Sequence, residues 1–138
     1  MTEKYYLDSC IWIDYFENRS DRFRPLGDWA FSLIKQIIRE SNLIIYSDLV
    51  EEELLKYFDD IHIKEIISII PKQLLIKIET KAKQLEEAIK ISKKLRIPVK
   101  DALHAILARD NDTILVTRDK HFYELAKQVT IKKPEDLL

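Results

Sequence analysis

The stretch VKDALHAILARDNDTILVTRD (residues 99–119) combines the two patterns that decide the fold. Residues 101–109 carry small and aliphatic side chains at positions that a helix would bury, and the compact apolar run TILV (113–116) has the length of a buried strand. The runs KYYL (4–7) and LIIY (43–46) have the same character, and helical patterns separate these strand candidates. Strands that alternate with helices are typical of α/β domains. We therefore predict an α/β fold, a three-layer α/β/α sandwich with a mostly parallel central sheet.

The other segments fit this alternation. We expect helices over residues 11–17, 28–40, 48–58, 61–70, 80–95 and 122–127, a strand or an extended connection over 74–78, and a short last strand over 129–131. Ser47 is placed to cap the helix that follows it, and Pro71 and Pro98 interrupt the chain between elements. A length of 138 residues suits one domain with a real core, so residues 1–138 are predicted to form a single domain.

Composition excludes several classes of function. Lys and Arg number 23 against 24 Asp and Glu, so the net charge of −1 gives no global attraction to nucleic acid and any such binding needs a local patch. Gly27 is the only glycine, which excludes a glycine-rich phosphate loop, and Cys10 is the only cysteine, which excludes an internal disulfide or a Cys-rich zinc site. No apolar run approaches the length of a membrane span and no signal pattern opens the chain, so we expect a cytoplasmic protein without membrane association.

Four acidic residues fall at comparable places in the predicted elements. Asp8 directly follows the first strand, and Asp119 lies just past TILV. Glu53 is within the first two turns of the helix after LIIY, and Asp101 begins the helix after Pro98. Ligands of parallel α/β sheets bind in the crevice beyond the carboxyl ends of the strands. We therefore expect the four acids to form one dense anionic cluster there.

Such a cluster needs a counterion. Carboxylates within about 4–6 Å repel one another and raise one another's pKa. A hard divalent cation removes this repulsion, and Mg²⁺ and Mn²⁺ prefer oxygen ligands. Such ions lower the pKa of a bound water and polarise a phosphoryl oxygen. The residues therefore point to Mg²⁺- or Mn²⁺-assisted hydrolysis of phosphodiesters.

The motifs that carry these acids resemble those of a known family. YLDSCIWIDYF (6–16) is similar to the opening strand, acid and first helix of PIN-domain ribonucleases, and SDLVEEEL (47–54) is similar to their second motif. VKDALHAILA (99–108) and ILVTRDKHF (114–122) resemble the third and fourth motifs, and PEDLL (134–138) resembles the usual tail. In size the chain looks like a VapC-type toxin of a toxin–antitoxin pair.

The resemblance implies roles for individual residues. It implies that Asp8 and Asp119 hold the main metal ion, that Glu53 and Asp101 complete the shell or orient the attacking water, and that Thr117 and Ser9 give polar support.

The second acid of this set is ambiguous in the sequence. Glu51, Glu52 and Glu53 are consecutive; Glu53 is favoured because it shares a helical face with Val50 and Leu54, and Glu52 stays an alternative.

Each residue alone also has an ordinary structural interpretation. Asp8 and Asp101 are suited to cap helices, Glu53 to a solvated helix face and Asp119 to a turn. His104 lies on the same helix as Asp101 and is close enough to approach the site, but a packed or surface histidine is the simpler interpretation.

The resulting hypothesis is a Mg²⁺- or Mn²⁺-dependent endoribonuclease that hydrolyses RNA phosphodiester bonds as the toxin of a toxin–antitoxin pair. The resemblance implies an antitoxin that covers the acidic site, and the apolar surplus of residues 61–70 is a candidate face for a homodimer. A PIN-fold RNA-processing nuclease without an antitoxin and a non-catalytic PIN-like binding module remain alternatives. A phosphatase is disfavoured because Ser9 and Cys10 stand where a second acid would follow Asp8.

Overall fold

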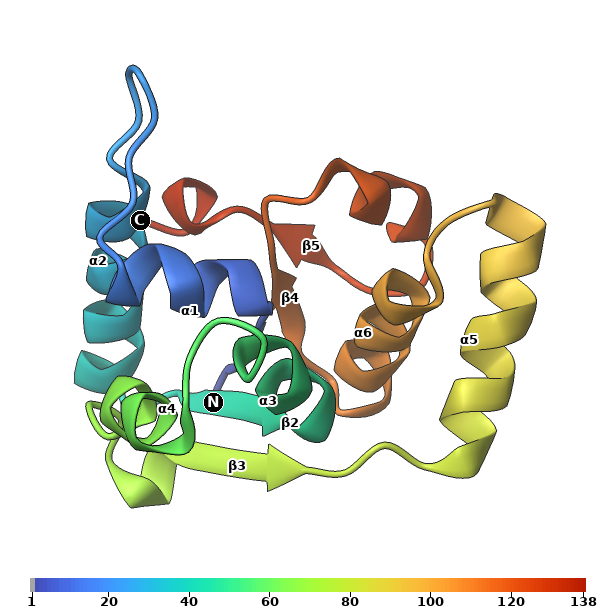
Figure 1. Cartoon of the computed structure of the whole chain (residues 1–138), viewed down its shortest axis with the longest axis horizontal. Helices are drawn as coiled ribbons and strands as arrows, with labels where there is room; N and C mark the ends of the chain where they lie inside the picture. The colour runs from blue at the N-terminus through green and yellow to red at the C-terminus, as the bar shows by residue number, and fades with distance from the viewer. Residues whose placement is uncertain (1) are drawn as a thin grey trace.

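A parallel sheet forms the centre of the molecule in the computed structural model, which describes residues 2–138 (Figure 1). Its five strands within those residues are β1 (Lys4–Leu7), β2 (Leu43–Ser47), β3 (Leu75–Ile78), β4 (Ile114–Val116) and β5 (Ile131–Lys132). They lie in the order β3-β2-β1-β4-β5, and every neighbouring pair is parallel. The predicted mostly parallel sheet is therefore confirmed, and none of its strand pairs within the described residues is antiparallel.

The central strands are continuous apolar runs because both faces of the sheet are covered. Tyr6 and Leu7 in β1, Ile44 in β2, and Leu115 and Val116 in β4 are all fully buried. Side chains point alternately to the two faces of a strand, so burial of adjacent residues requires a layer of helices on each side.

The helices supply those two layers. They are α1 (Ser9–Phe16), α2 (Leu26–Arg39), α3 (Asp48–Leu54), α4 (Asp60–Ile67), α5 (Ala82–Leu95) and α6 (Val99–Asp110), with 3₁₀ turns η1 (Lys72–Leu74), η2 (Lys120–Leu125) and η3 (Pro134–Asp136). Figure 1 shows α1 and α2 on one side of the strands and α5 and α6 on the other. The predicted three-layer α/β/α sandwich is confirmed, with the sheet between the two sets of helices.

One predicted helix is shorter than expected. The helix predicted over residues 48–58 ends at Leu54, and Tyr57, which lies within the predicted range, is 63% exposed. Turns continue the chain to Asp59, whose side chain accepts a hydrogen bond from the backbone N–H of His62 and so begins a new helix, α4. The break leaves Tyr57 on the surface beside the carboxyl ends of the strands.

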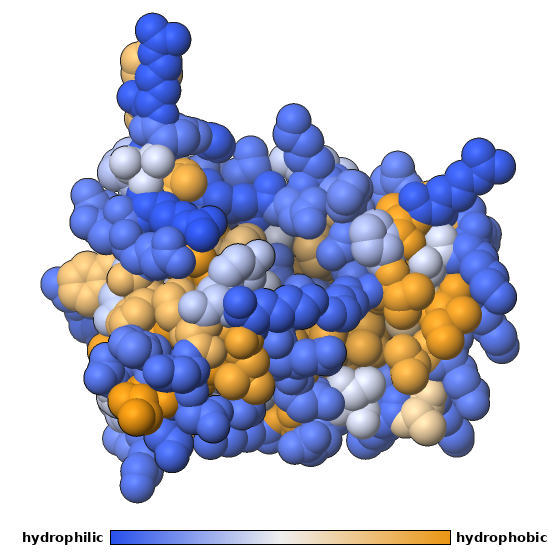
Figure 2. All heavy atoms as spheres, in the orientation of Figure 1, coloured by the Kyte–Doolittle hydropathy of each residue, from blue (hydrophilic) through white to orange (hydrophobic). Residues whose placement is uncertain are grey.

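The surface is largely hydrophilic, with apolar side chains near α4 and α5 (Figure 2). Ile61 at the start of α4 is 69% exposed, and Leu85 and Ile89 of α5 are 43% and 38% exposed. Within residues 2–138, no helix combines the length and the apolar character needed to cross a lipid bilayer.

Candidate active site

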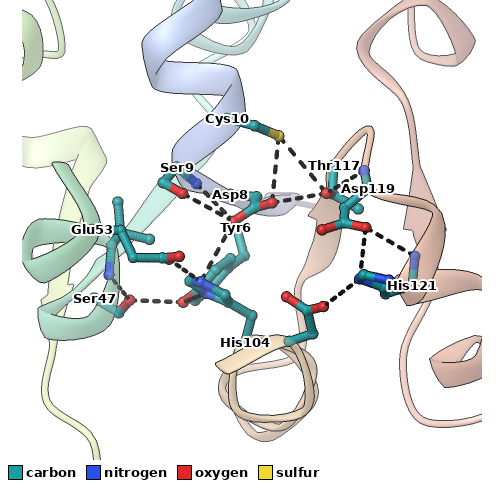
Figure 3. Close-up of polar contacts among 12 residues, drawn as sticks. Tyr6, Asp8, Ser9, Cys10, Ser47, Glu53, His104, Thr117, Asp119 and His121 are labelled. Carbon is teal, nitrogen blue, oxygen red and sulfur yellow. Dashed lines mark hydrogen bonds and ion pairs between the residues drawn. The ribbon is translucent and has the colours of Figure 1, made fainter. Parts of the chain in front are cut away.

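The ends of three strands bring the predicted residues to one edge of the sheet. β1 ends one residue before Asp8, whose backbone N–H extends the pairing by donating to the Val116 carbonyl of β4 at 3.0 Å. Beyond Val116 the chain leaves the sheet and carries Thr117 and Asp119 to the same edge. Figure 3 shows Asp8 between Glu53 and Asp119, as parallel strands predict.

Helices α3 and α6 place the other two acids. Ser47, the last residue of β2, caps α3 by accepting a hydrogen bond from the Val50 N–H at 3.1 Å, as predicted, and this start sets Glu53 in the last turn. α6 begins at Val99, so Asp101 lies in its first turn rather than at its cap. The interpretation of Asp101 as a helix cap was therefore wrong, because Pro98 occupies the cap position.

Asp8, Glu53 and His104 form the first of two groups. A ligand atom from each lies within 4.8 Å of those of the others. His104 Nε2 is 3.5 Å from Asp8 Oδ1 and contacts the Glu53 carboxylate directly. The side chains of His104 and Asp8 are only 1% and 8% exposed, whereas that of Glu53 is 23% exposed. The group is therefore shielded from water except at Glu53.

A buried hydrogen-bond chain fixes the imidazole of this group. The Tyr6 hydroxyl is 2.7 Å from His104 Nδ1 and 2.7 Å from Ser47 Oγ. Both Tyr6 and His104 are fully buried, so these bonds act where water does not compete. They point Nε2 of His104 at the two carboxylates.

The charges of this group stabilise one another. Burial lowers the pKa of His104, but the nearby carboxylates of Asp8 and Glu53 raise it more, so the net pKa lies above its ordinary value. Burial raises the pKa of Glu53, but the hydrogen bond and charge of His104 outweigh it and the net pKa is lowered. The two shifts agree, and both favour an imidazolium beside carboxylates.

Asp101, Asp119 and His121 form the second group. His121 Nδ1 lies 3.1 Å from Asp101 Oδ2 and 3.3 Å from Asp119 Oδ1. Burial and the charges of Asp119 and Asp8 raise the pKa of Asp101 to about 6. Burial is the largest cause of this shift, and a bound cation would relieve the part that comes from the two neighbouring carboxylates.

Thr117 joins the two groups. Its hydroxyl donates to Asp8 Oδ2 at 2.9 Å and accepts the Asp119 backbone N–H at 3.1 Å. Ser9 also donates its backbone N–H to Asp8 Oδ1 at 2.8 Å, and Cys10 Sγ lies 3.4 Å from Asp8 Oδ2. Asp8 is thus held in one orientation by its neighbours.

The arrangement differs from the predicted one in its grouping. All four acids reach the same edge of the sheet, but Asp8 lies with Glu53 and Asp119 lies with Asp101, where the sequence paired Asp8 with Asp119. Asp8 and Asp119 also cap α1 and η2, so each of these residues has a structural role in addition to its predicted functional role.

Glu52 lies outside both groups. Its side chain is 64% exposed and lies 3.9 Å from Lys100. The helical-face argument that favoured Glu53 over Glu52 therefore agrees with the positions of the two side chains.

Two histidines join the site beyond the four predicted acids. His104, for which a packed position and an approach to the site were both considered, is buried and also contacts Asp8 and Glu53, whereas His121 received no role. The spacing held a signal for each: Asp101 and His104 are one helical turn apart on α6, and His121 follows Asp119 by two residues. Neither spacing reveals that each histidine also contacts a carboxylate from a distant segment, Glu53 for His104 and Asp101 for His121.

The donor set fits a divalent cation. Two carboxylates meet in each group, and carboxylate oxygens are ligands that suit Mg²⁺ and Mn²⁺. A cation held there would relieve the repulsion of Asp101 by Asp119 and Asp8, which adds to burial in raising the pKa of Asp101.

Asp101→Asn is expected to stabilise the metal-free protein. The folded pKa of Asp101, about 6, is above its ordinary value of 3.8, so its ionisation opposes folding as pH rises through that interval. Each pKa unit corresponds to about 1.4 kcal/mol. With solvent relaxation we expect a gain of about 2 kcal/mol at pH 7.5 that vanishes near pH 4. Thermal melting in excess chelator measures it, with the exposed Asp28→Asn as control; a lower midpoint than wild type would assign Asp101 a structural role.

Comparisons with known proteins agree with this fold. The family described as the PIN domain matches residues 5–128. The structure of VapBC2 from Rickettsia felis bound to a promoter DNA fragment is 19% identical, with 94% of this chain and 98% of that chain covered and a TM-score of 0.68. A toxin–antitoxin complex from Klebsiella pneumoniae is 20% identical, with 94% and 96% covered and a TM-score of 0.62.

A third structure extends this similarity. VapBC-1 from nontypeable Haemophilus influenzae is 15% identical, with 96% of this chain and 98% of that chain covered and a TM-score of 0.65. At these identities the structures establish a shared fold. No curated protein matches the chain. The match of the family over residues 5–128, together with the sheet order and the strand-end acids, shows that this chain belongs to the PIN domain family.

Proposed function

We propose that the protein is a Mg²⁺- or Mn²⁺-dependent endoribonuclease. The observation that carries this proposal is the convergence of Asp8, Glu53, Asp101 and Asp119, from four separate segments, on one edge of the sheet. Membership of the PIN domain family supports it, because PIN domains are nucleases.

The chain's own residues prepare the reaction. A divalent cation held by the acids supplies polarisation of the phosphoryl oxygen and lowers the pKa of the attacking water. Asp8 and Glu53 would hold a cation at the first group, and Asp119 and Asp101 at the second. Thr117 fixes the position of Asp8 relative to the Asp119 backbone through its two hydrogen bonds. His104 holds the carboxylates of Asp8 and Glu53 close to each other.

Cleavage of end-labelled single-stranded RNA tests this proposal. We expect internal cuts with Mg²⁺ or Mn²⁺ and none in excess chelator, because four carboxylates without a cation repel the phosphate of the substrate. Equal cleavage with and without chelator would contradict the metal dependence. Intact RNA at every metal concentration would favour the non-catalytic binding module.

We further propose that the nuclease is the toxin of a toxin–antitoxin pair. Three structures that share its fold over nearly their whole length are described as VapBC or toxin–antitoxin complexes. An antitoxin that covers the acidic edge would block access of RNA, and the exposed Ile61 on α4 marks the proposed homodimer face. Copurification with the product of a neighbouring reading frame would support the pair; a chain that occurs without such a neighbour would favour an RNA-processing nuclease.

A further inference from the structure

Two cavities open beside the acidic edge, one on each side of Asp8. The first, here the Tyr57 cavity, has a volume of about 220 Å³ and is lined by the first turns of α1 together with Arg19, Glu53, Lys56 and Tyr57. It reaches the site because Glu53 belongs to both.

The second cavity lies beyond β4. This Tyr123 cavity has a volume of about 130 Å³, and its lining includes Thr117, Asp119, Tyr123, Lys132 and Lys133. Figure 3 shows Ser9 and Glu53 on one side of Asp8 and Thr117 and Asp119 on the other, so the two cavities flank the acids.

Positive charge gathers at the Tyr57 cavity. The side chain of Arg19 is 46% exposed, and its ion pair with Glu17 is long at 3.4 Å. Lys56 is exposed and lines the same cavity, so its ammonium and the Arg19 guanidinium lie at one rim. An anion placed there would relieve their repulsion.

The Tyr123 cavity has a similar composition. Lys132 is exposed and Lys133 half-buried, and Asp136 lies beside them in the lining. Arg118 also lines the cavity, but its charge is already paired with Asp14 at 3.3 Å and with Glu135 at 2.9 Å. The two lysines are therefore the cations that face an incoming ligand.

Each cavity also carries an exposed aromatic ring. Tyr57 is 63% exposed and Tyr123 is 60% exposed, although large aromatic side chains are usually much more buried. An exposed ring beside lysines is the composition of proteins that bind single-stranded nucleic acid, where bases stack on the ring and cations contact the backbone.

We propose that the two cavities bind the nucleotides on either side of the cleaved phosphodiester, with one unpaired base stacked on Tyr57 and another on Tyr123. This inference rests on the proposed ribonuclease function and assigns Tyr57 and Tyr123 as the residues that position its single-stranded RNA. A paired base keeps its faces within the duplex stack, so it cannot lie on a side-chain ring. Arg19 and Lys56 on one side, and Lys132 and Lys133 on the other, contact the backbone phosphates.

Local cations, and not the net charge of the chain, would attract RNA to both cavities. The net charge of −1 leaves only local patches to attract a polyanion, and these patches adjoin Glu53 and Asp119. The cations of the two cavities therefore hold an RNA strand beside the acidic residues that would otherwise repel its phosphates.

Fluorescence anisotropy with a labelled single-stranded RNA tests the inference without cleavage, using Asp8→Asn as the background. Tyr57→Ala and Tyr123→Ala should each weaken binding by roughly 5- to 150-fold, whereas Tyr57→Phe and Tyr123→Phe keep the ring and most of the affinity. Lys132→Ala should lower the slope of log affinity against log salt by about 0.7. Lys90→Ala on α5, an exposed lysine that lines neither cavity, is the matched control.

The outcomes separate this inference from the proposed function. If the wild type cleaves RNA but both tyrosine-to-alanine variants bind it normally, the inference is overturned, the ribonuclease function stands, and the cavities are left to a protein partner. If those variants lose affinity while the wild type fails to cleave, the RNA path is supported and the nuclease proposal fails. Melting curves equal to those of the Asp8→Asn background confirm that the variants fold, as the exposure of both rings predicts.

Discussion

Asp8→Asn is expected to lower RNA cleavage by about 100-fold or more while leaving the fold intact. Loss of a residue that only supports a metal ligand costs about 10- to 100-fold, so loss of the ligand charge itself should cost at least the upper value. The amide can still accept the Ser9 N–H bond that caps α1 and can lie beside the Thr117 hydroxyl. Single-turnover cleavage of labelled RNA measures the rate, and circular dichroism measures the fold.

A matched pair on α3 controls for removal of a charge near the site. Glu53→Gln should lower cleavage because Glu53 lies within 4.8 Å of Asp8 and His104, whereas Glu52→Gln should retain it because Glu52 points into solvent. Cleavage by Asp8→Asn at the wild-type rate would remove the catalytic assignment of this edge of the sheet. The reverse result on α3 would make Glu52 the second acid.

His104→Leu is expected to produce the largest loss of stability in the metal-free protein. The variant leaves Asp8 and Glu53 without their cation and removes one of the two hydrogen-bond partners of the Tyr6 hydroxyl, which keeps its bond with Ser47. Removal of one member of a buried ion pair costs about 3–5 kcal/mol. We expect about 3 kcal/mol here, because Glu53 keeps some contact with water. Urea unfolding in excess chelator measures this difference.

The loss should depend on pH in a defined direction. The pKa of folded His104 is raised above its ordinary value of 6.5, so its charge adds stability that is fully present below that value. This contribution is lost as pH rises through the raised folded pKa, and the difference between His104→Leu and wild type should shrink accordingly. His62→Leu, which changes a half-exposed histidine on α4, is the control. A pH-independent difference would show that His104 acts through packing and not through charge.

The fold was largely predictable because its signals are local. LIIY and the ILV of TILV are short continuous apolar runs, as is typical of strands covered on both faces, and they form most of β2 and all of β4. The helix predicted over 48–58 failed at its end because the cap at Asp59, a local competitor, restarts the chain as α4 and turns Tyr57 outward. Helix ends depend on such competition between caps, which apolar spacing does not reveal.

The site was predictable only in part, because its contacts join distant segments. That Asp8 and Asp119 follow strands could be inferred from the sequence, since parallel strands end at one edge. The contact of His104 with Glu53, 51 residues away, depends on how α3 and α6 face each other across that edge. Spacing within one element gives no information on such a contact, so the sequence could offer His104 only as a residue near the site, and His121 was identified only from the structure.

Calorimetric titration of the chelator-treated protein with Mn²⁺ tests most directly whether the acidic edge is a metal centre. The acid cluster predicts saturable binding by the wild type at or below millimolar Mn²⁺ and much weaker binding by Asp8→Asn, with Glu52→Gln unchanged. Heat changes that are absent in the wild type up to millimolar Mn²⁺, or identical in wild type and Asp8→Asn, would contradict it.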